Sequence, residues 1–470
     1  MTYTFYNTIN GENRSSSNVH RGVNPRTEEE LWDCPIASVE DLNEAVAAAE
    51  KAFKTWGRST MDERKAVLTK MAEKMKEHAA ELEEIVRLET GKSALLSNIE
   101  VNNTCGQCTY YAKNYLEDET VHEDDSVKIV HTHVPLGVVG AIAPWNFPLI
   151  LSNLKVVSSL ITGNCVIVKP SPFTPYATMK ATELCQSFLP PGVLQCLNGG
   201  ADLGAAMTGH PGIAKISFTG TIATGKRVMA SCAKTLKRLT LELAGNDAAI
   251  VCEDVDVQKV AGLTAAGAFF NGGQVCVATK RVYVHESIYD EFLKAYVDAV
   301  KSNFKITEDA SQMTVFVPLS NKPQFDIVKG IVEDCKKNNY HIVTGGNVSE
   351  KGYWIEPTVV SKPPEDSFLV QEEQFGPIIP ILSFSDVDDA LGRANLSNSG
   401  LGATVYSKDL KRAEDIARRL EAGSVWINGP EKLHPAGFFS GLKDSGFGGE
   451  MGKQGLLSYS YTKTLHFNKA

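Results

Sequence analysis

The stretch "GVVGAIAPWNFPLILSNLKVVSSLITGNCVIVKP", residues 137–170, places a long apolar segment of helical type between two short β-rich runs. Strands that alternate with helices in this way predict βαβ units and a parallel sheet. Three more β-rich runs follow, at residues 193–200, 214–220 and 238–245. Together these runs predict a doubly wound sheet, an architecture that holds nucleotides at the carboxyl ends of its strands.

A second series of strands and helices begins beyond residue 245. Its β-rich runs lie at residues 248–254, 281–287, 378–384, 402–407 and 423–428, and they predict a second α/β domain. The alternating segment 127–137 predicts an extended hairpin arm. The tail 456–467 also alternates, and we expect it to pair with something outside its own domain.

The region before the arm is predicted to be helical. One helix opens at Ser38, with Asp41 three residues later as in a capping box. A longer amphipathic helix over residues 61–92 is expected to end at Gly91, a natural C-terminal cap. After the run "VIVKP", Thr174 is the expected N-cap and Pro175 the expected first helical residue.

Length, charge and hydropathy exclude several classes of protein. A chain of 470 residues is too long for one hydrophobic core, so two or three domains are expected. The net charge of −9, with basic residues scattered, argues against a nucleic-acid partner. The N-terminus lacks the pattern of a signal peptide, and polar residues and prolines interrupt the most apolar stretch, residues 134–168. We therefore expect a soluble, cytoplasmic protein with no membrane partner.

The ten cysteines are spread along the chain, which fits reduced thiols. Cys105 and Cys108 are a close pair, but no second pair or nearby histidine completes a site, so no metal is expected. Cys276 differs because the Gly-Gly-Gln sequence 272–274 precedes it and lets the backbone pass close to a ligand. It is either a small core residue or a thiolate nucleophile.

Two other residues stand where chemistry is possible. Glu242 lies in an apolar strand just before the end of the run, and it is either half of a structural ion pair or a general base whose pKa burial raises. Asn146 lies between Trp145 and Phe147 in an apolar turn. Its amide either satisfies the turn or donates to a developing oxyanion.

Seven motifs then occur in a fixed order. They are "PWNFP" (144–148), "IVKPS" (167–171), "SFTGTIATG" (217–225), "LELAG" (241–245), "FFNGGQVC" (269–276), "EEQFGP" (372–377) and "SGFGGEMG" (445–452). With these motifs the chain resembles the NAD(P)-dependent aldehyde dehydrogenase superfamily from about residue 20 to its C-terminus. The resemblance implies an α/β fold with a Rossmann-type nucleotide domain (1–119 and 137–244), a second α/β catalytic domain (245–435) and a small β oligomerisation arm (120–136 and 455–470). A homodimer or homotetramer is implied as well.

The resemblance also implies an oxidation in two halves. Cys276 attacks the aldehyde, and the Asn146 side chain and the backbone N–H of Cys276 hold the oxyanion. Hydride then leaves for the nicotinamide, and Glu242 activates the water that hydrolyses the thioester to a carboxylic acid. Lys155 is expected to support proton transfer or structure.

Further site residues are carried over by position. The implied cofactor is NAD or NADP, and its expected contacts are Lys169 at the adenine ribose, Gly220 and Thr221 at the pyrophosphate, Glu373 at the nicotinamide ribose, Phe375 beside the nicotinamide, and Ser171, Leu243 and Trp145. The expected substrate-lining residues are Phe147, Leu151, Val275, Val277, Leu433 and Phe439. Leu433 is expected to face inward, with Glu431 at the rim, so a medium-sized apolar or aromatic aldehyde is favoured.

Several positions depart from the superfamily's usual pattern, and three of them bear on coenzyme choice and hydrolysis. Pro172 stands where many NAD-preferring members have a glutamate, so NADP should be tolerated. Ala244 replaces a glycine next to Glu242, and a positive φ there would cost about 1 kcal/mol and slow hydrolysis. Lys453 replaces a second glutamate near the C-terminus, so a proton relay through that residue is expected to be absent.

These departures keep two alternatives open. In one, hydrolysis is impaired and another nucleophile takes the acyl group, which would make the chain an acylating dehydrogenase. In the other, the chain is a catalytically silent scaffold that retains the fold.

Overall fold

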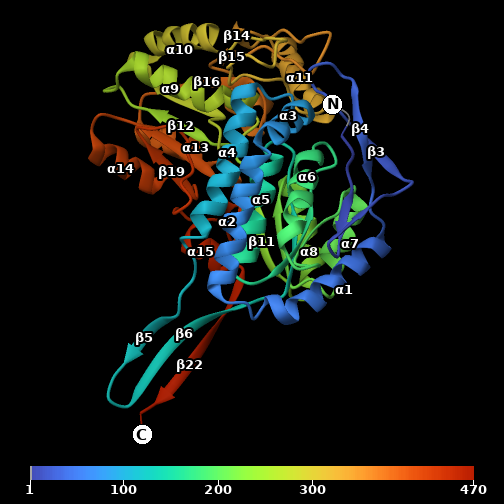
Figure 1. Cartoon of the computed structure of the whole chain (residues 1–470). Coiled ribbons are helices and arrows are strands. Elements are labelled where there is room, and N and C mark those ends of the chain that lie inside the picture. The colour runs from blue at the N-terminus through green and yellow to red at the C-terminus, as the bar shows by residue number, and fades with distance from the viewer. Residues whose placement is uncertain (1–2, 470) are drawn as a thin grey trace.

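The computed structural model describes residues 3–469 and contains two large α/β sheets with a projecting arm (Figure 1). The eight-stranded sheet has the order β2-β1-β9-β8-β7-β10-β11-β21. Its parallel centre consists of β7 (Val138–Ile142), β8 (Cys165–Lys169), β9 (Leu194–Cys196), β10 (Lys215–Thr219) and β11 (Arg238–Glu242). These are the five predicted strands, and the doubly wound parallel sheet is confirmed.

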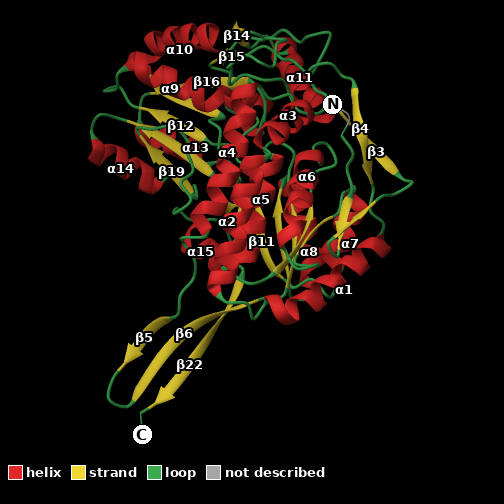
Figure 2. Ribbon diagram, in the orientation of Figure 1, coloured by secondary structure: helices red, strands yellow, loops and turns green. Residues whose placement is uncertain are grey.

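Short antiparallel strands that the sequence analysis did not predict complete this sheet. They are β1 (Asn7–Ile9) and β2 (Glu12–Arg14) at one edge and β21 (Gly446–Phe447) at the other. A separate ribbon, β3 (Val19–Val23) with β4 (Glu30–Pro35), runs along the outside of the molecule (Figure 2).

Helices cover the first sheet. Those between its strands are α5 (Pro148–Ile161), α6 (Tyr176–Cys185), α7 (Ala201–Gly209) and α8 (Ile222–Ala233); those before it are α1 (Val39–Trp56), α2 (Met61–Glu77), α3 (Ala79–Thr90) and α4 (Ala94–Tyr111). Helices α2, α4 and α5 pack on one another, whereas α1 packs with α7 against the strands. Helix α5 is buried along most of its length, and its buried residues include Lys155 as well as apolar side chains.

The predicted helix boundaries hold in part. Ser38 and Asp41 form the expected capping box at the start of α1. Gly91 ends α3 with a left-handed φ of 75°, as predicted, but the single helix expected over 61–92 is two helices that meet at His78. The prediction at α6 is wrong by one residue: Pro175 is the N-cap and Tyr176 the first helical residue.

The second sheet has seven strands in the order β14-β15-β16-β13-β12-β18-β19. They are β12 (Ala248–Val251), β13 (Arg281–His285), β14 (His341–Thr344), β15 (Thr358–Ser361), β16 (Ile378–Phe384), β18 (Gly402–Tyr406) and β19 (Ser424–Ile427). Its helices are α9 (Val257–Phe269), α10 (Tyr289–Asn303), α11 (Lys322–Lys337), α12 (Phe368–Gln371), α13 (Val387–Asn395) and α14 (Leu410–Arg419). The five predicted strands are confirmed, and β14 and β15 were not predicted.

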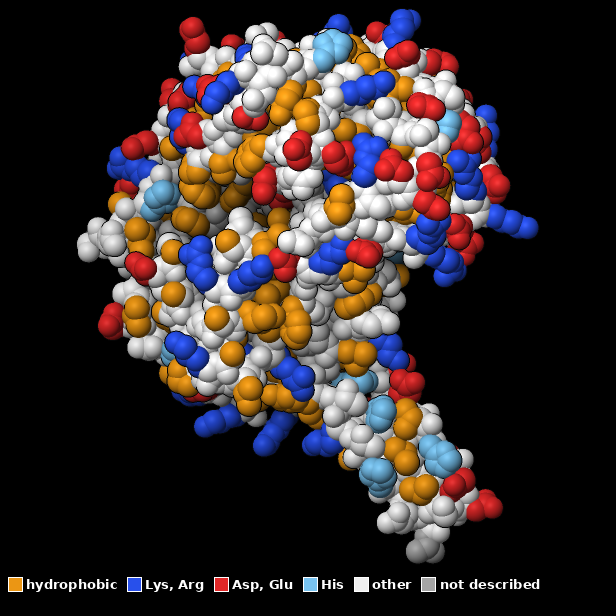
Figure 3. All heavy atoms as spheres, turned by 180° about the vertical axis from the view of Figure 1, so that it is seen from behind, with side chains coloured by type: hydrophobic (Ala, Val, Ile, Leu, Met, Phe, Trp, Pro, Cys, Tyr) orange, Lys and Arg blue, Asp and Glu red, His pale blue; other side chains and the backbone are white. Residues whose placement is uncertain are grey.

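The arm is a three-stranded antiparallel sheet that projects away from the body (Figure 1). It consists of β5 (Glu119–Glu123), β6 (Val127–Pro135) and the C-terminal strand β22 (Ser460–Asn468), which pairs with β6 along its whole length. The predicted hairpin is confirmed, and the tail does leave its own domain to pair. One face of the arm carries histidines and hydrophobic side chains (Figure 3).

Three small elements lie near the C-terminus: β17 (Ser399–Gly400) pairs with β20 (Leu442–Lys443), and α15 (Gly452–Leu457) leads into β22. Within residues 3–469, no helix is both long and apolar enough to cross a membrane.

Candidate active site

The turn that carries Asn146 touches the loop that carries Cys276. Asn146 follows β7, and its side-chain Nδ2 donates to the carbonyl oxygen of Gln274 at 3.1 Å. Glu242 is the last residue of β11, two strands away from β7 in the same sheet. The carboxyl ends of parallel strands therefore bring two of the predicted residues to the loop of the third.

The loop before Cys276 is a tight left-handed turn. Asn271, Gly272 and Gly273 have φ values of 54°, 64° and 76°. A Cβ atom on Gly272 would lie 2.6 Å from the carbonyl oxygen of Val317, and one on Gly273 would lie 2.4 Å from that of Gly376. The glycines are needed because the loop passes against other backbone, and the close approach to a ligand predicted from the sequence stays a prediction.

Cys276 and Cys105 are only partly buried, whereas the other eight cysteines are buried. Burial of the thiol group, followed by the charge of Glu242, raises the pKa of Cys276 to about 12. The thiol is therefore protonated at neutral pH, and its attack on a carbonyl requires a base to take the proton.

Glu242 has the properties of such a base. Its side chain is only 4% exposed, and burial raises the pKa of Glu242 to about 8. Thr219 Oγ1 donates to Oε2 at 3.4 Å, whereas Oε1 has no partner among the described residues. The free oxygen and the raised pKa fit a proton acceptor better than half of a structural ion pair.

Lys155 lies behind Glu242 in a buried cluster that the sequence analysis missed in part. Its Nζ donates to Ser217 Oγ at 2.9 Å and to Glu450 Oε1 at 3.3 Å. Glu450 is fully buried and also accepts from Tyr459 Oη at 2.8 Å. Lys155 is the strongest influence that lowers the pKa of Glu242 against the effect of burial.

One prediction about this cluster is wrong. Lys453 does not take the place of an interior glutamate, because it is exposed and pairs with Glu119 on the arm at 2.9 Å. The interior carboxylate is Glu450, three residues earlier, and it contacts Lys155 directly. A buried glutamate that contacts Lys155 is therefore present.

A second buried ion pair supports the Asn146 turn, and it too was missed. Lys92 Nζ pairs with Glu100 and donates to the carbonyl oxygen of Asn146 at 2.8 Å. Glu100 Oε1 accepts from the backbone N–H of Leu149 at 3.0 Å, at the first turn of α5. The carboxylate holds the helix N-terminus, and the ammonium holds the turn before it.

The predicted adenosine and pyrophosphate residues lie along the carboxyl edge of the first sheet. Lys169 ends β8, and burial lowers the pKa of Lys169 to about 8. Ser171 is buried just beyond it, and Pro172 is half-buried. Thr221 is the exposed N-cap of α8, where the helix offers unpaired N–H groups. Gly220 and Leu243 lie in the two loops that follow β10 and β11.

Glu373 and Phe375 approach the same region from the second sheet. Glu373 Oε1 accepts from the backbone N–H of Gly245 at 3.1 Å, and burial raises the pKa of Glu373 to about 7. Phe375 has a positive φ of 46°, a strained conformation for a bulky residue. Its ring meets that of Trp145 edge-on with centroids 5.4 Å apart, so two predicted cofactor residues are in contact.

The predicted substrate residues differ in how deeply they are buried. Phe147, Leu151 and Val275 are half-buried, whereas Val277 and Phe439 are buried in the core of the first sheet.

The prediction for the loop over 428–439 is wrong in its orientation. Leu433 is 36% exposed and does not face inward. Glu431 points inward instead: it accepts from Thr279 Oγ1 at 2.5 Å and from Thr404 Oγ1 at 2.9 Å. The hydroxyl groups of two buried threonines make this inward position acceptable for a carboxylate.

Ala244 does not strain the Glu242 strand. Ten of the non-glycine residues within 3–469 have positive φ, and Ala244 is not among them. The cost expected for this substitution is therefore absent, and so is the main structural reason to expect a defective base.

The fold and the site together define a cysteine-containing α/β dehydrogenase. The model of the aldehyde dehydrogenase family matches residues 12–465. A putative aldehyde dehydrogenase, FUS7 of Gibberella fujikuroi, is 42% identical over 467 residues, with 99% of each chain covered.

Solved structures agree with this assignment. The NAD⁺ complex of an aldehyde dehydrogenase from Bacillus cereus is 34% identical, with a TM-score of 0.95 over 99% of this chain and 97% of that one. Lactaldehyde dehydrogenase from Escherichia coli is 30% identical, with a TM-score of 0.96 over the whole of both chains. The chain belongs to the aldehyde dehydrogenase family, an oxidoreductase family in which a cysteine nucleophile is typical.

Proposed function

We propose that the protein oxidises an aldehyde to the carboxylic acid with NAD or NADP, through a covalent adduct on Cys276. The observation that carries the proposal is the contact between the Asn146 amide and the Cys276 loop, with the buried carboxyl of Glu242 acting on the same thiol. An amide donor, a thiol and a base with a raised pKa are the groups that this reaction requires.

The first half of the reaction uses all three groups. Glu242 takes the proton from the Cys276 thiol as sulfur bonds to the aldehyde carbon, and the carbonyl oxygen becomes an oxyanion. An amide nitrogen carries two hydrogens, and Asn146 uses one of them on the carbonyl of Gln274. That hydrogen bond fixes the direction of the second hydrogen, which is free for the oxyanion together with the Cys276 N–H.

The residues at the edges of the two sheets fit a dinucleotide. Lys169 and Ser171 would hold the adenosine end, the N-terminus of α8 at Thr221 the pyrophosphate, and Glu373 the second ribose. A nicotinamide bound beside Phe375 and Trp145 supplies the hydride acceptor that the oxidation needs. Pro172 carries no charge to repel a 2′-phosphate, so the site favours tolerance of NADP.

The second half uses Glu242 again. Once ionised, Glu242 takes a proton from water, and the hydroxyl adds to the thioester on Cys276. The carbon–sulfur bond then breaks, the acid leaves, and the thiolate regains a proton. Lys155 and Glu450 lie next to the base, and we assign them the task of holding its charge and passing its proton onward.

The substrate class follows from the partly exposed lining. Phe147, Leu151 and Val275 are apolar and half-buried close to the nucleophile loop, so we propose a medium-sized apolar or aromatic aldehyde.

Replacement of Cys276 by serine tests the proposal. Cys276→Ser should reduce aldehyde-dependent formation of NADH or NADPH by at least about 10³-fold, because a serine hydroxyl is a far weaker nucleophile. Cys105→Ser is the matched control, since it removes the other partly exposed thiol, and it should keep native activity. Undiminished oxidation in Cys276→Ser would overturn the proposal. Free acid as the product in the presence of coenzyme A would exclude the acylating alternative.

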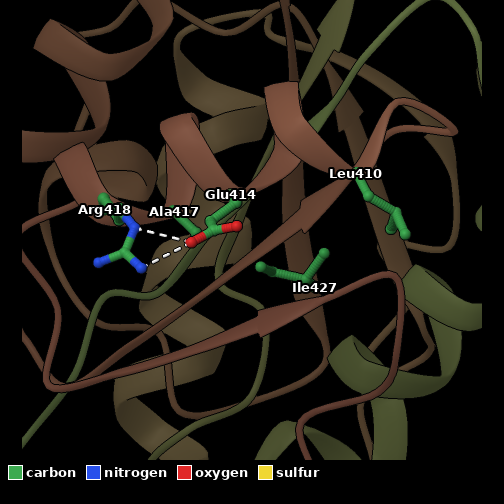
Figure 4. A pocket seen from close by; sticks show the side chains of 5 residues that line it. All are labelled: Leu410, Glu414, Ala417, Arg418 and Ile427. Atoms are coloured by element: carbon green, nitrogen blue, oxygen red, sulfur yellow. Dashed lines mark hydrogen bonds and ion pairs between the residues drawn. The ribbon is translucent and has the colours of Figure 1, made fainter.

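We also propose that the chain assembles as a homodimer or homotetramer. Strand β19 is an edge strand of the second sheet; its last residue, Ile427, is 39% exposed, and Leu410 at the start of α14 is 66% exposed. They line a shallow depression of about 480 Å³, with Glu414 and Arg418 paired at its side (Figure 4). An unpaired edge and an apolar depression beside it suit a second copy of the same surface.

The arm provides a second surface for assembly. Val121, Leu465 and Phe467 are 44%, 37% and 50% exposed on a sheet that projects from the body (Figure 3). Such apolar side chains on a thin sheet are best covered by another subunit.

A further inference from the structure

Lys280 is a fully buried lysine whose contacts no step of the proposed reaction has used. Its side chain is 1% exposed, and it lies four residues after Cys276. Its Nζ donates to the carbonyl oxygens of Val275 at 2.7 Å, Cys276 at 3.4 Å and Ala278 at 3.2 Å. The ammonium group therefore caps the loop that carries the nucleophile, by binding three carbonyls that face the same point.

The same ammonium reaches the predicted cofactor carboxylate. Lys280 Nζ lies 3.7 Å from Glu373 Oε1 and 5.6 Å from the centre of the Phe375 ring. Glu373 has a second fixed contact, the N–H of Gly245. One cation thus touches both the nucleophile loop and the residue expected to hold the nicotinamide ribose.

The charges around Cys276 explain why a cation is needed there. Glu242 at the end of β11, Asp247 before β12 and Glu373 after α12 face the thiol, and each raises the pKa of Cys276 when ionised. Lys280 is the cation that opposes them and lowers this pKa. Lys155 and Glu450 act on Glu242 and pair with each other.

Lysine suits this position for a geometric reason. An ammonium group has three hydrogens around one nitrogen, which match carbonyls converging from one loop. Methionine has nearly the same shape but neither charge nor donors. Arginine keeps the charge but spreads its donors over a planar fork.

We propose that Lys280 is a positioning residue of the active site, which fixes the Cys276 loop against Glu373 and stabilises the thiolate that attacks the aldehyde. The proposal rests on the proposed function, in which Cys276 is the nucleophile. It extends that function to a residue whose charge acts on the reacting sulfur through a fixed loop.

The test measures the thiol directly, without aldehyde or coenzyme. The rate of Cys276 alkylation by iodoacetamide is followed by mass spectrometry from pH 7 to pH 9, in a Cys105→Ser background. Lys280→Met should alkylate about tenfold more slowly at each pH, which corresponds to a rise of about one unit in the pKa of the thiol. Lys280→Arg should restore the rate to within about threefold of native, since the charge is retained.

A matched control separates charge from packing. Lys237 is also a buried lysine that donates to two backbone carbonyls, those of His210 and Ile213, and it is not among the charges that act on Cys276. Lys237→Met should lose thermal stability without changing alkylation. Native alkylation in a folded Lys280→Met, or no recovery in Lys280→Arg, would overturn the proposal.

A second variant keeps the test decisive if Lys280→Met does not fold. Lys280→Gln keeps N–H donors for the loop carbonyls but removes the charge, so alkylation should become several-fold slower than native at each pH. An unchanged or faster alkylation rate would overturn the proposal. Failure of the proposed function looks different, because Cys276→Ser would then keep its dehydrogenase activity whatever the lysine does.

Discussion

Replacement of Glu242 by glutamine isolates the base. The substitution keeps the size of the side chain and the hydrogen bond from Thr219, but it removes the ionisable group. With a pKa of about 8 for Glu242, about one-tenth of the native protein carries the ionised base at pH 7 and about nine-tenths at pH 9. Because only the ionised form accepts a proton, native hydrolysis of the thioester should rise about tenfold between these pH values.

The assay counts the acyl group on the protein. The enzyme is mixed with aldehyde and NAD⁺, quenched in acid at set times, and weighed intact by mass spectrometry. Because Glu242 serves both halves of the reaction, Glu242→Gln should form the acyl adduct more slowly than native, hydrolyse it about 10²–10⁴-fold more slowly, and show no tenfold rise with pH. The surface variant Glu77→Gln is the control and should behave as native. A pH-independent native rate, or native hydrolysis in Glu242→Gln, would refute the reasoning.

The same variant should also change stability with a definite sign. The pKa of Glu242 is raised from its ordinary value of 4.5 to about 8, so the stability linked to this group is fully present below about pH 4.5 and is lost as pH rises through 8. The full difference corresponds to about 5 kcal/mol. Glu242→Gln should therefore melt at a higher temperature than native protein at pH 9, and the advantage should shrink towards pH 6.

Two further predictions concern the coenzyme and the assembly. Pro172→Glu should raise the KM for NADP about tenfold or more and leave the KM for NAD within about threefold, because a carboxylate beside the ribose repels a 2′-phosphate. Steady-state kinetics with each coenzyme measures both KM values. Equal changes in the two KM values would contradict the prediction. Leu465→Lys combined with Phe467→Lys places charges on one face of β22 and should reduce the assembly to a smaller species in analytical ultracentrifugation. The control Lys463→Ala should leave the assembly unchanged. An unchanged native sedimentation coefficient in the charged variant would show that the arm is not an interface.

The central strands of both sheets could be predicted because a strand that is buried on both faces has a continuous apolar sequence. Strands β1, β14 and β15 have only three or four residues and lie at or near sheet edges, so their composition carries too little pattern. The break at His78 was missed for a related reason: the apolar stripe continues across it, and His78 is an ordinary residue with no sequence signal for a stop.

The site could be predicted where a motif places a residue on a strand end. Glu242 is such a residue, whereas Asn146 and Cys276 lie in loops that their motifs mark, and these two loops touch as expected. The sequence did not predict that three charged residues belong to the site, because a charged residue usually lies at the protein surface. These residues are Lys92, Lys280 and Glu450. Only three-dimensional contacts reveal that each of them is buried against a partner.

The tail of the chain ties assembly to chemistry. Tyr459 donates its hydroxyl to Glu450, its carbonyl oxygen is held by Asn164, and the next residue begins β22. The projecting C-terminal strand is thereby joined, within a few bonds, to the buried carboxylate that contacts Lys155. Fusion partners for this enzyme therefore belong at its other end.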